Sequence, residues 1–79
     1  MTITVGYFAI LREQRGLSEE RLTTTASSPS ELYHELRARH GFTLEARYIR
    51  GDVNDEFVSM SQPLSDGDHV VFIPPVAGG

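Results

Sequence analysis

A short apolar run that leads directly into two prolines limits how this chain can fold more than any other feature. Within His69–Ile73 the last four residues are all apolar, which is typical of a strand buried in the middle of a sheet. Proline fixes φ and has no amide hydrogen to donate, so Pro74 and Pro75 end the strand and keep the chain extended. We therefore expect one domain over residues 1–73 and an extended, flexible tail over residues 74–79.

The tail ends in two glycines, Gly78 and Gly79, which follow Val76 and Ala77. Six extended residues span roughly 20 Å at about 3.3–3.6 Å each, which is long enough to enter a slot in another protein. Because glycine has no side chain, a narrow channel can admit the terminal carboxylate and reacting groups can approach it. The alternative is a terminus that simply frays, since the ends of most domains are poorly ordered.

The clearest local pattern is a helix that starts after Ser28 and ends before Gly41. Ser28 and Glu31 form a capping-box pattern, and Pro29 occupies the first helical position, where its missing amide hydrogen costs nothing. One stripe of this helix is apolar and consists of Leu32, Tyr33 and Leu36. The sequence therefore predicts one amphipathic helix of about three turns.

Shorter elements surround this helix. Alternation and β-branched residues predict four further strands, over residues 2–8, 20–25, 48–53 and 56–58. A short helix over residues 9–15 is capped by Gly16, and Asn54 with Asp55 favours a hairpin turn. Two strands, a long helix and further strands that finish on a central one predict an α+β domain. Its mixed sheet wraps around one main helix, the ubiquitin-like β-grasp arrangement.

Composition narrows the possible functions. A domain of 79 residues has no room for a deep, enclosed active site, so any chemistry needs a second protein. A net charge of −4 without a basic run argues against nucleic acid or an anionic membrane as partner, and nothing resembles a signal peptide or a membrane span. We expect a cytoplasmic protein. With no cysteine, and with His34, His40 and His69 scattered, we expect no metal site.

A resemblance to a known family rests on YFAILRE at residues 7–13, VN and E at residues 53, 54 and 56, LSDGD at 64–68 and FIPPVAGG at 72–79. These segments resemble the small, sulfur-carrying subunit of molybdopterin synthase, of the MoaD/ThiS type, and the similarity covers essentially the whole chain. The acidic turn, apolar strand, Pro-Pro spacer and Gly-Gly end are fairly specific together. Ala77 departs from the pattern, because relatives often carry a small hydroxyl residue there.

This resemblance implies a sulfur carrier in molybdenum cofactor biosynthesis. An E1-like adenylyltransferase would use ATP to activate Gly79, and a sulfur donor protein would convert the adenylate to a thiocarboxylate. The tail would then insert into the large subunit, in a heterotetramer of two small and two large subunits, and donate sulfur to cyclic pyranopterin monophosphate. The chain itself would be a non-catalytic subunit without a permanently bound cofactor. Its tail would be guided by Pro74, Pro75, Val76, Ala77 and Gly78.

A partner surface is expected at the root of the tail. In a strand, Ile73 shares one face with Val71, while Phe72 lies on the other, and a single long helix covers only one side of the sheet. One apolar set therefore needs another partner. We predict a patch that consists of Phe8, Phe57 and Ile73 and is continued by Val76.

Two alternatives stay open. The chain could be a sulfur carrier for another pathway, such as thiamine thiazole synthesis or tRNA thiolation, or a ubiquitin-like protein tag. It could instead be a β-grasp interaction module whose tail is inert, because a fold does not fix a function. Gene neighbourhood, or co-purification with a pterin-processing subunit, separates these possibilities.

Overall fold

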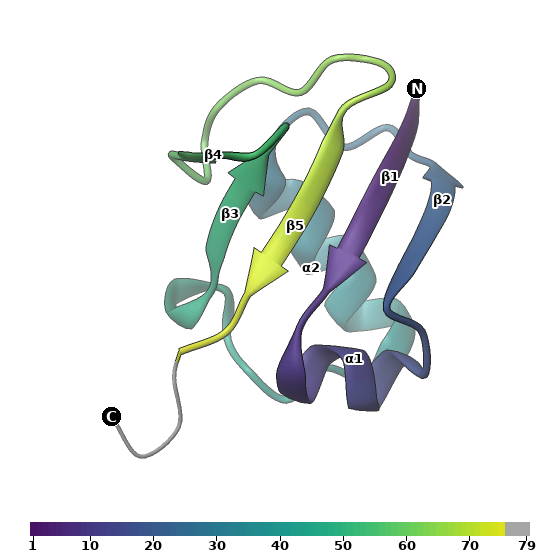
Figure 1. Ribbon diagram of the computed structural model, residues 1–79, viewed down its shortest axis with the longest axis vertical. Helices are drawn as coiled ribbons and strands as arrows, with labels where there is room; N and C mark the ends of the chain where they lie inside the picture. Colours follow the sequence, from purple (N-terminus) through teal and green to yellow (C-terminus); the bar gives the residue numbers. More distant parts are fainter. Residues whose placement is uncertain (76–79) are drawn as a thin grey trace.

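A computed structural model describes residues 1–75 of the chain. Its elements are β1 (Thr2–Tyr7), α1 (Ala9–Arg15), β2 (Glu19–Thr23), α2 (Pro29–His40), the 3-10 helix η1 (Ala46–Tyr48), β3 (Arg50–Val53), β4 (Glu56–Val58) and β5 (His69–Ile73). The strands form one sheet in the order β2-β1-β5-β3-β4, and α2 crosses one face of it (Figure 1). The predicted β-grasp fold and the central position of β5 are confirmed. No helix in this part of the chain is long and apolar enough to cross a membrane.

Parallel pairing of β1 with β5 decides where the tail leaves the domain. The other three pairs of neighbouring strands are antiparallel, whereas β1 and β5 run in the same direction, with Tyr7 paired to Phe72. Both strands therefore end at the same edge of the sheet. Because α1 starts directly after β1, this short helix lies beside the point where the chain leaves β5 (Figure 1).

Both ends of α2 follow the sequence closely. The amide of Glu31 donates to the Ser28 hydroxyl oxygen over 3.2 Å, and Gly41 closes the helix with φ of 71°. A capping box also predicts that the Glu31 carboxylate accepts from the Ser28 amide. That prediction was wrong, because the carboxylate accepts from the Ser27 hydroxyl instead. The hydroxyl of Ser27, one residue before the cap, gives the carboxylate a charge-assisted hydrogen bond. Both serines therefore make hydrogen bonds to Glu31 in the first turn of the helix.

The core lies between α2 and the sheet. The alternating apolar residues of β1 all point into it, as expected, and Leu11 is the one buried residue of α1. Tyr33 of α2 packs edge-on against Phe72 of β5, with ring centroids 5.3 Å apart. The fully buried side chains are Ile3, Val5, Leu11, Pro29, Leu32, Tyr33, Leu36, Val70 and Phe72.

The third strand starts later than its sequence suggests. We expected it to begin at Tyr48, but Tyr48 ends η1 and the strand begins at Arg50. The amide of Tyr48 donates to the Glu45 carbonyl over 3.0 Å, and the Arg47 guanidinium lies 4.8 Å from the Tyr48 ring centre. These local contacts favour a helical turn where β-propensity alone favours a strand.

Gly51 lies inside β3, where a side chain would require the flexible Met60 side chain to move. A β-carbon at this position would come within 2.9 Å of the Met60 sulfur.

The predicted hairpin that follows β3 is confirmed, since Asn54 and Asp55 both have positive φ, 52° and 70°, and join β3 to β4. Positive φ at both turn residues is what a two-residue hairpin with native twist needs.

A partly buried ion pair joins the end of α1 to the sheet. Arg15 donates from Nε and Nη2 to the two carboxylate oxygens of Glu20, at 2.7 and 2.8 Å. The Tyr7 hydroxyl donates to the same carboxylate over 2.6 Å. The hydrogen bonds from Arg15 hold the pKa of Glu20 at about 2, well below its ordinary 4.5. Burial, together with this carboxylate, raises the pKa of Tyr7.

Removing the Glu20 charge should therefore destabilise the domain in a pH-dependent way. We expect Glu20→Gln to lower the free energy of unfolding by about 1–2 kcal/mol near pH 7, because a charge-assisted pair is lost. Since the pKa of Glu20 is lower in the folded state, this contribution is present above about pH 4.5 and is lost as pH falls toward 2. Urea denaturation over this pH range measures it, with Glu45→Gln as control, since its 3.5 Å pair is exposed. A difference that does not change with pH would contradict the prediction.

Candidate functional site

A groove of about 760 Å³ lies where the chain leaves the sheet, between α1 and the end of β5. We call it the tail-root groove. Its wall is mostly apolar and is made by Phe8, Ala9, Ile10, Leu44, Ile73, Pro74 and Pro75, with Arg12 and Glu13 as its charged residues. Because the two prolines form part of the wall, any protein that receives the tail also meets this groove.

The local sequence of α1 explains why its apolar residues face outward. Leu11 is fully buried and fixes the orientation of this short helix on the core. Ile10, one position earlier, then points away from the core, while Phe8 precedes the helix in an extended conformation. Accordingly Phe8 is 52% exposed and Ile10 is also exposed. The parallel register of β1 and β5 brings Phe8 close to Ile73 across the groove.

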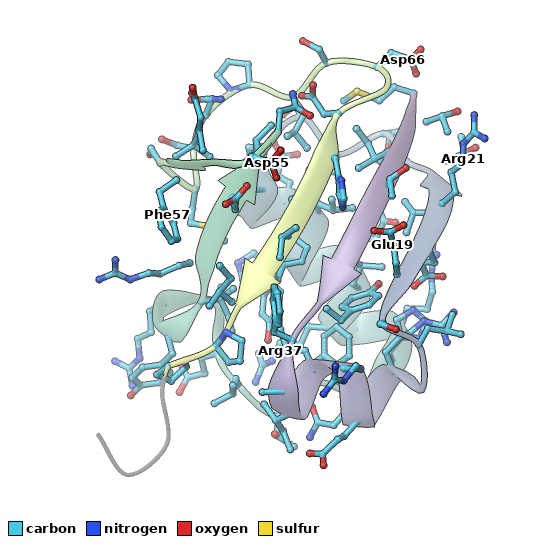
Figure 2. All side chains as sticks on the ribbon, viewed as in Figure 1. Glu19, Arg21, Arg37, Asp55, Phe57 and Asp66 are labelled. Carbon is cyan, nitrogen blue, oxygen red and sulfur yellow. The ribbon has the colours of Figure 1, made fainter. Side chains whose placement is uncertain are left out.

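The sheet face opposite α2 carries the remaining apolar side chains of the predicted patch. Strand β5 buries its alternate residues Val70 and Phe72 against α2, whereas Val71 and Ile73 on the other face are only half-buried. Phe57 of the edge strand β4 is 69% exposed and projects away from the sheet (Figure 2).

The structure brings part of the predicted patch together. Phe8 and Ile73 both line the tail-root groove, but Phe57 does not. Phe57 pairs with Asp52, and Asp52 pairs with Val71, so β3 separates Phe57 from β5. Phe57 is thus on the same face as Ile73 but two strands away. Of the other predicted site residues, Pro74 and Pro75 line the groove, while Val76, Ala77, Gly78 and Gly79 lie outside the described residues.

Three apolar groove residues, Ala9, Ile10 and Leu44, were missed by sequence reasoning. Ala9 and Ile10 were assigned only to the short helix over residues 9–15, and Leu44 lies in none of the predicted elements. The exposure of Ile10 could have been predicted, because Ile10 and Leu11 are adjacent and a helix cannot bury both on one narrow face. No comparable sign exists for Leu44, which reaches the groove through tertiary packing.

Two charged groups of the open sheet face differ in their distance from the groove along β5. His69 is the first residue of β5, and its Nε2 atom lies 3.2 Å from a carboxylate oxygen of Glu19 on β2. Arg50 of β3 is exposed and is paired across the ladder with Ile73. Within residues 1–75, no group of three acidic or histidine side chains is arranged to hold a metal ion.

The geometry suits docking more than catalysis. The groove is open and mostly apolar, and Pro74 and Pro75 form part of its wall. Its charged residues, Arg12 and Glu13, are exposed. An exposed apolar surface beside the start of a tail is typical of a protein-protein contact. The geometry therefore indicates a docking surface.

Comparisons with known proteins give the family. The sequence profile of the ThiS family matches residues 5–79. The molybdopterin synthase sulfur carrier subunit of Escherichia coli is 35% identical over 80 residues, which cover 98% of this chain and 99% of that protein.

Solved structures give the same fold. A putative molybdopterin converting factor subunit 1 from Pyrococcus furiosus has a TM-score of 0.76 and 29% identity, over 96% of this chain and 99% of that one. A complex of subunits 1 and 2 of molybdopterin-converting factor from Helicobacter pylori matches with a TM-score of 0.68 and 26% identity, over all of both chains. SAMP1 from Haloferax volcanii, with a TM-score of 0.78 and 23% identity over all of both chains, shares the fold. The match to the family profile, together with the identity to the carrier from Escherichia coli, shows that this chain belongs to the ThiS family of ubiquitin-like β-grasp proteins.

Proposed function

We propose that this chain is a sulfur carrier of molybdenum cofactor biosynthesis, the small subunit of a molybdopterin synthase. One observation carries the proposal: the identity to the Escherichia coli sulfur carrier subunit extends over 98% of this chain and 99% of that protein. The tail-root groove supports it, because a carrier that inserts its tail into a partner needs a docking surface where the tail begins.

The chemistry of the proposal begins at the carboxylate of Gly79. A free α-carboxylate has a pKa of about 3.3–3.7, so it is ionised at neutral pH and is a poor electrophile. A carboxylate oxygen attacks the α-phosphorus of ATP and pyrophosphate leaves, which creates an acyl-adenylate. Sulfide-level sulfur supplied by a donor protein then attacks the carbonyl carbon, the C–O bond to the phosphate breaks, AMP leaves, and a thiocarboxylate remains on Gly79. ATP belongs to the adenylating enzyme, an E1-like protein, and this chain holds no permanent cofactor.

The partner that receives the sulfur is proposed to be the large subunit of molybdopterin synthase, in a heterotetramer with two copies of each chain. A related chain from Helicobacter pylori occurs in a complex of subunits 1 and 2 of molybdopterin-converting factor, which supports this assignment. Phe8, Ile10 and Ile73 of the tail-root groove would contact the large subunit while the tail enters it. There the sulfur would pass to cyclic pyranopterin monophosphate.

The direct test is intact-mass analysis after incubation with the adenylating enzyme, ATP and a sulfur donor. One oxygen atom of the chain should be replaced by sulfur, and fragmentation should place the change on Gly79. Addition of the large subunit and the pterin precursor should then return the carboxylate form. A chain that is never adenylated, or whose sulfur is never passed to the pterin, would contradict the proposal.

The groove makes a separate prediction about assembly. We expect Ile73→Asp to weaken binding to the large subunit by about 2 kcal/mol or more, because a charge would replace an apolar contact at the centre of the docking surface. The fold should survive, since Ile73 is half-buried and faces away from α2. Isothermal titration calorimetry measures the affinity, and circular dichroism measures the fold.

Leu17→Asp is the matched control, because Leu17 is an exposed apolar residue that does not line the tail-root groove. Its affinity should stay near that of the wild type. Unchanged affinity of Ile73→Asp would remove Ile73 from the interface. An unfolded Ile73→Asp variant would instead place this side chain in the core.

A further inference from the structure

The cationic side chains of this sequence are all arginines, seven in number, and two of them border the start of the tail. Arg12 lines the tail-root groove together with Pro74 and Pro75. Arg50 is paired across the β3–β5 ladder with Ile73, the last residue of the sheet before the tail. Both guanidinium groups are exposed, and neither joins an ion pair within residues 1–75. Two guanidinium groups without an ion pair in this part of the chain therefore lie near the start of the tail, and Glu13 is the one carboxylate that lines the same groove.

Arginine and lysine differ in what they do to an activated carboxyl group. A guanidinium has a pKa above about 12 and is not a nucleophile at neutral pH, whereas a small fraction of lysine is free amine. A free amine attacks the carbonyl carbon of an acyl-adenylate. A C–N bond forms, the C–O bond to the phosphate breaks, AMP leaves and a proton passes to water. The amide that results can no longer accept sulfur.

The α-amino group of Met1 lies far from the groove. It donates to the Thr24 carbonyl over 2.9 Å, at the start of β1 and opposite the end where the tail leaves (Figure 1). Tyr7 pairs with Phe72, and Met1 precedes Tyr7 by six residues, or roughly 20 Å at about 3.3 Å per residue. The tail spans roughly 20 Å only when fully extended, so this amine is at the limit of its reach.

We propose that Arg12 and Arg50 are specificity-determining residues that give the tail root positive charge without a nucleophilic amine, so the activated Gly79 carbonyl is kept for sulfur. This inference rests on the proposed function, because it concerns the activated form of the same glycine. Positive charge at these positions attracts the anionic groups of the reaction, namely the carboxylate and the adenylate phosphate. Lysine would supply the same charge together with a competing reaction.

A C-terminal thioester tests this inference without any adenylating enzyme. The full chain fused to a self-cleaving intein gives a thioester at Gly79 when it is released with a small thiol. Wild type, Arg12→Lys and Arg50→Lys are then followed at about pH 8 by intact mass. Each variant keeps its charge and changes an exposed side chain, so the fold should be retained.

Arg21→Lys is the control, since Arg21 lies on the outer strand β2 (Figure 2). Arg21 pairs with Thr4, and Thr4 pairs with His69, so it is two strands across and four residues along from Ile73. At about 4.8 Å per strand and 3.3 Å per residue, these two perpendicular displacements give a direct separation of roughly 16 Å.

Wild type should lose its thioester by hydrolysis to the monomeric acid. Arg12→Lys and Arg50→Lys should form the cyclic amide at least tenfold faster than wild type or Arg21→Lys, because the new amine has a higher effective concentration near the tail. Equal amide formation in wild type, or hydrolysis alone in both tail-root variants, would overturn the inference. Equally fast cyclisation of Arg21→Lys would also overturn it, since position would not matter. Failure of the proposed function would appear elsewhere, as absence of a thiocarboxylate in the enzymatic assay.

Discussion

Deletion of Gly79 should abolish sulfur transfer to the pterin precursor while the domain stays folded. The deletion withdraws the terminal carboxylate by one residue, about 3.3–3.6 Å, which is as large as the distance between reacting atoms in a productive complex. Folding should not change, because β5 ends at Ile73, six residues earlier. Dithiolene formation with the large subunit measures the transfer, and urea denaturation measures the stability.

Two further variants separate the chemistry of Gly79 from the fit of the tail. A residue appended after Gly79 should abolish transfer as well, because the glycyl carboxylate is no longer terminal. Gly78→Ala should lower product formation about tenfold or more, roughly 1.4 kcal/mol of transition-state stabilisation, since a methyl group adds bulk and restricts φ. If a chain without both glycines formed the dithiolene at the normal rate, the carrier proposal would be wrong and the interaction-module alternative would replace it.

Elements with local determinants were predictable from the sequence. The bond from Glu31 to Ser28 and the left-handed Gly41 fix α2 within a few residues, and the prolines after Ile73 end β5. The start of β3 was not predictable, because η1 depends on a turn that Glu45 closes by its carbonyl. A hydrophobic pattern predicts that a strand or helix is present, but a local hydrogen bond such as this one can move the residue at which it begins.

The candidate site was predictable only in part, because it forms from segments far apart in the chain. The alternation in β5 correctly places Ile73 on the face opposite α2, and Phe8 lies beside it through the parallel β1–β5 pair. The hairpin puts Phe57 on the same face, but β3 lies between Phe57 and the groove. Leu44 joins the groove by tertiary packing, which no local pattern encodes.

Strand β5 therefore separates two roles by the direction of its side chains. Val70 and Phe72 face α2 and are completely buried, so they stabilise the domain. Val71 and Ile73 face the other way and are half-buried, so they remain accessible to a partner. Substitutions at adjacent positions of this one strand should consequently affect different measurements.

Truncation of Phe72 to alanine should destabilise the domain by about 3–5 kcal/mol, the usual cost of removing a buried aromatic ring. Phe72 has no exposed surface, and its ring packs edge-on against Tyr33 at 5.3 Å between centroids. A domain of 79 residues has a total stability of only about 4–12 kcal/mol at 0.05–0.15 kcal/mol per residue, so Phe72→Ala should be marginally folded. Urea denaturation followed by circular dichroism measures the loss.

Val71→Ala is the control on the opposite face of the same strand. Val71 packs on Gly6 of β1, where a β-carbon would lie 3.2 Å from a Val71 methyl carbon, but the side chain is only half-buried. Its truncation removes two methyl groups that are partly in water, so the loss should be about 1 kcal/mol or less. If both variants lost the same free energy, the face opposite α2 would contribute to the core as much as the inner face. The separation of stability from docking along β5 would then be wrong, and Ile73→Asp would be expected to unfold the chain.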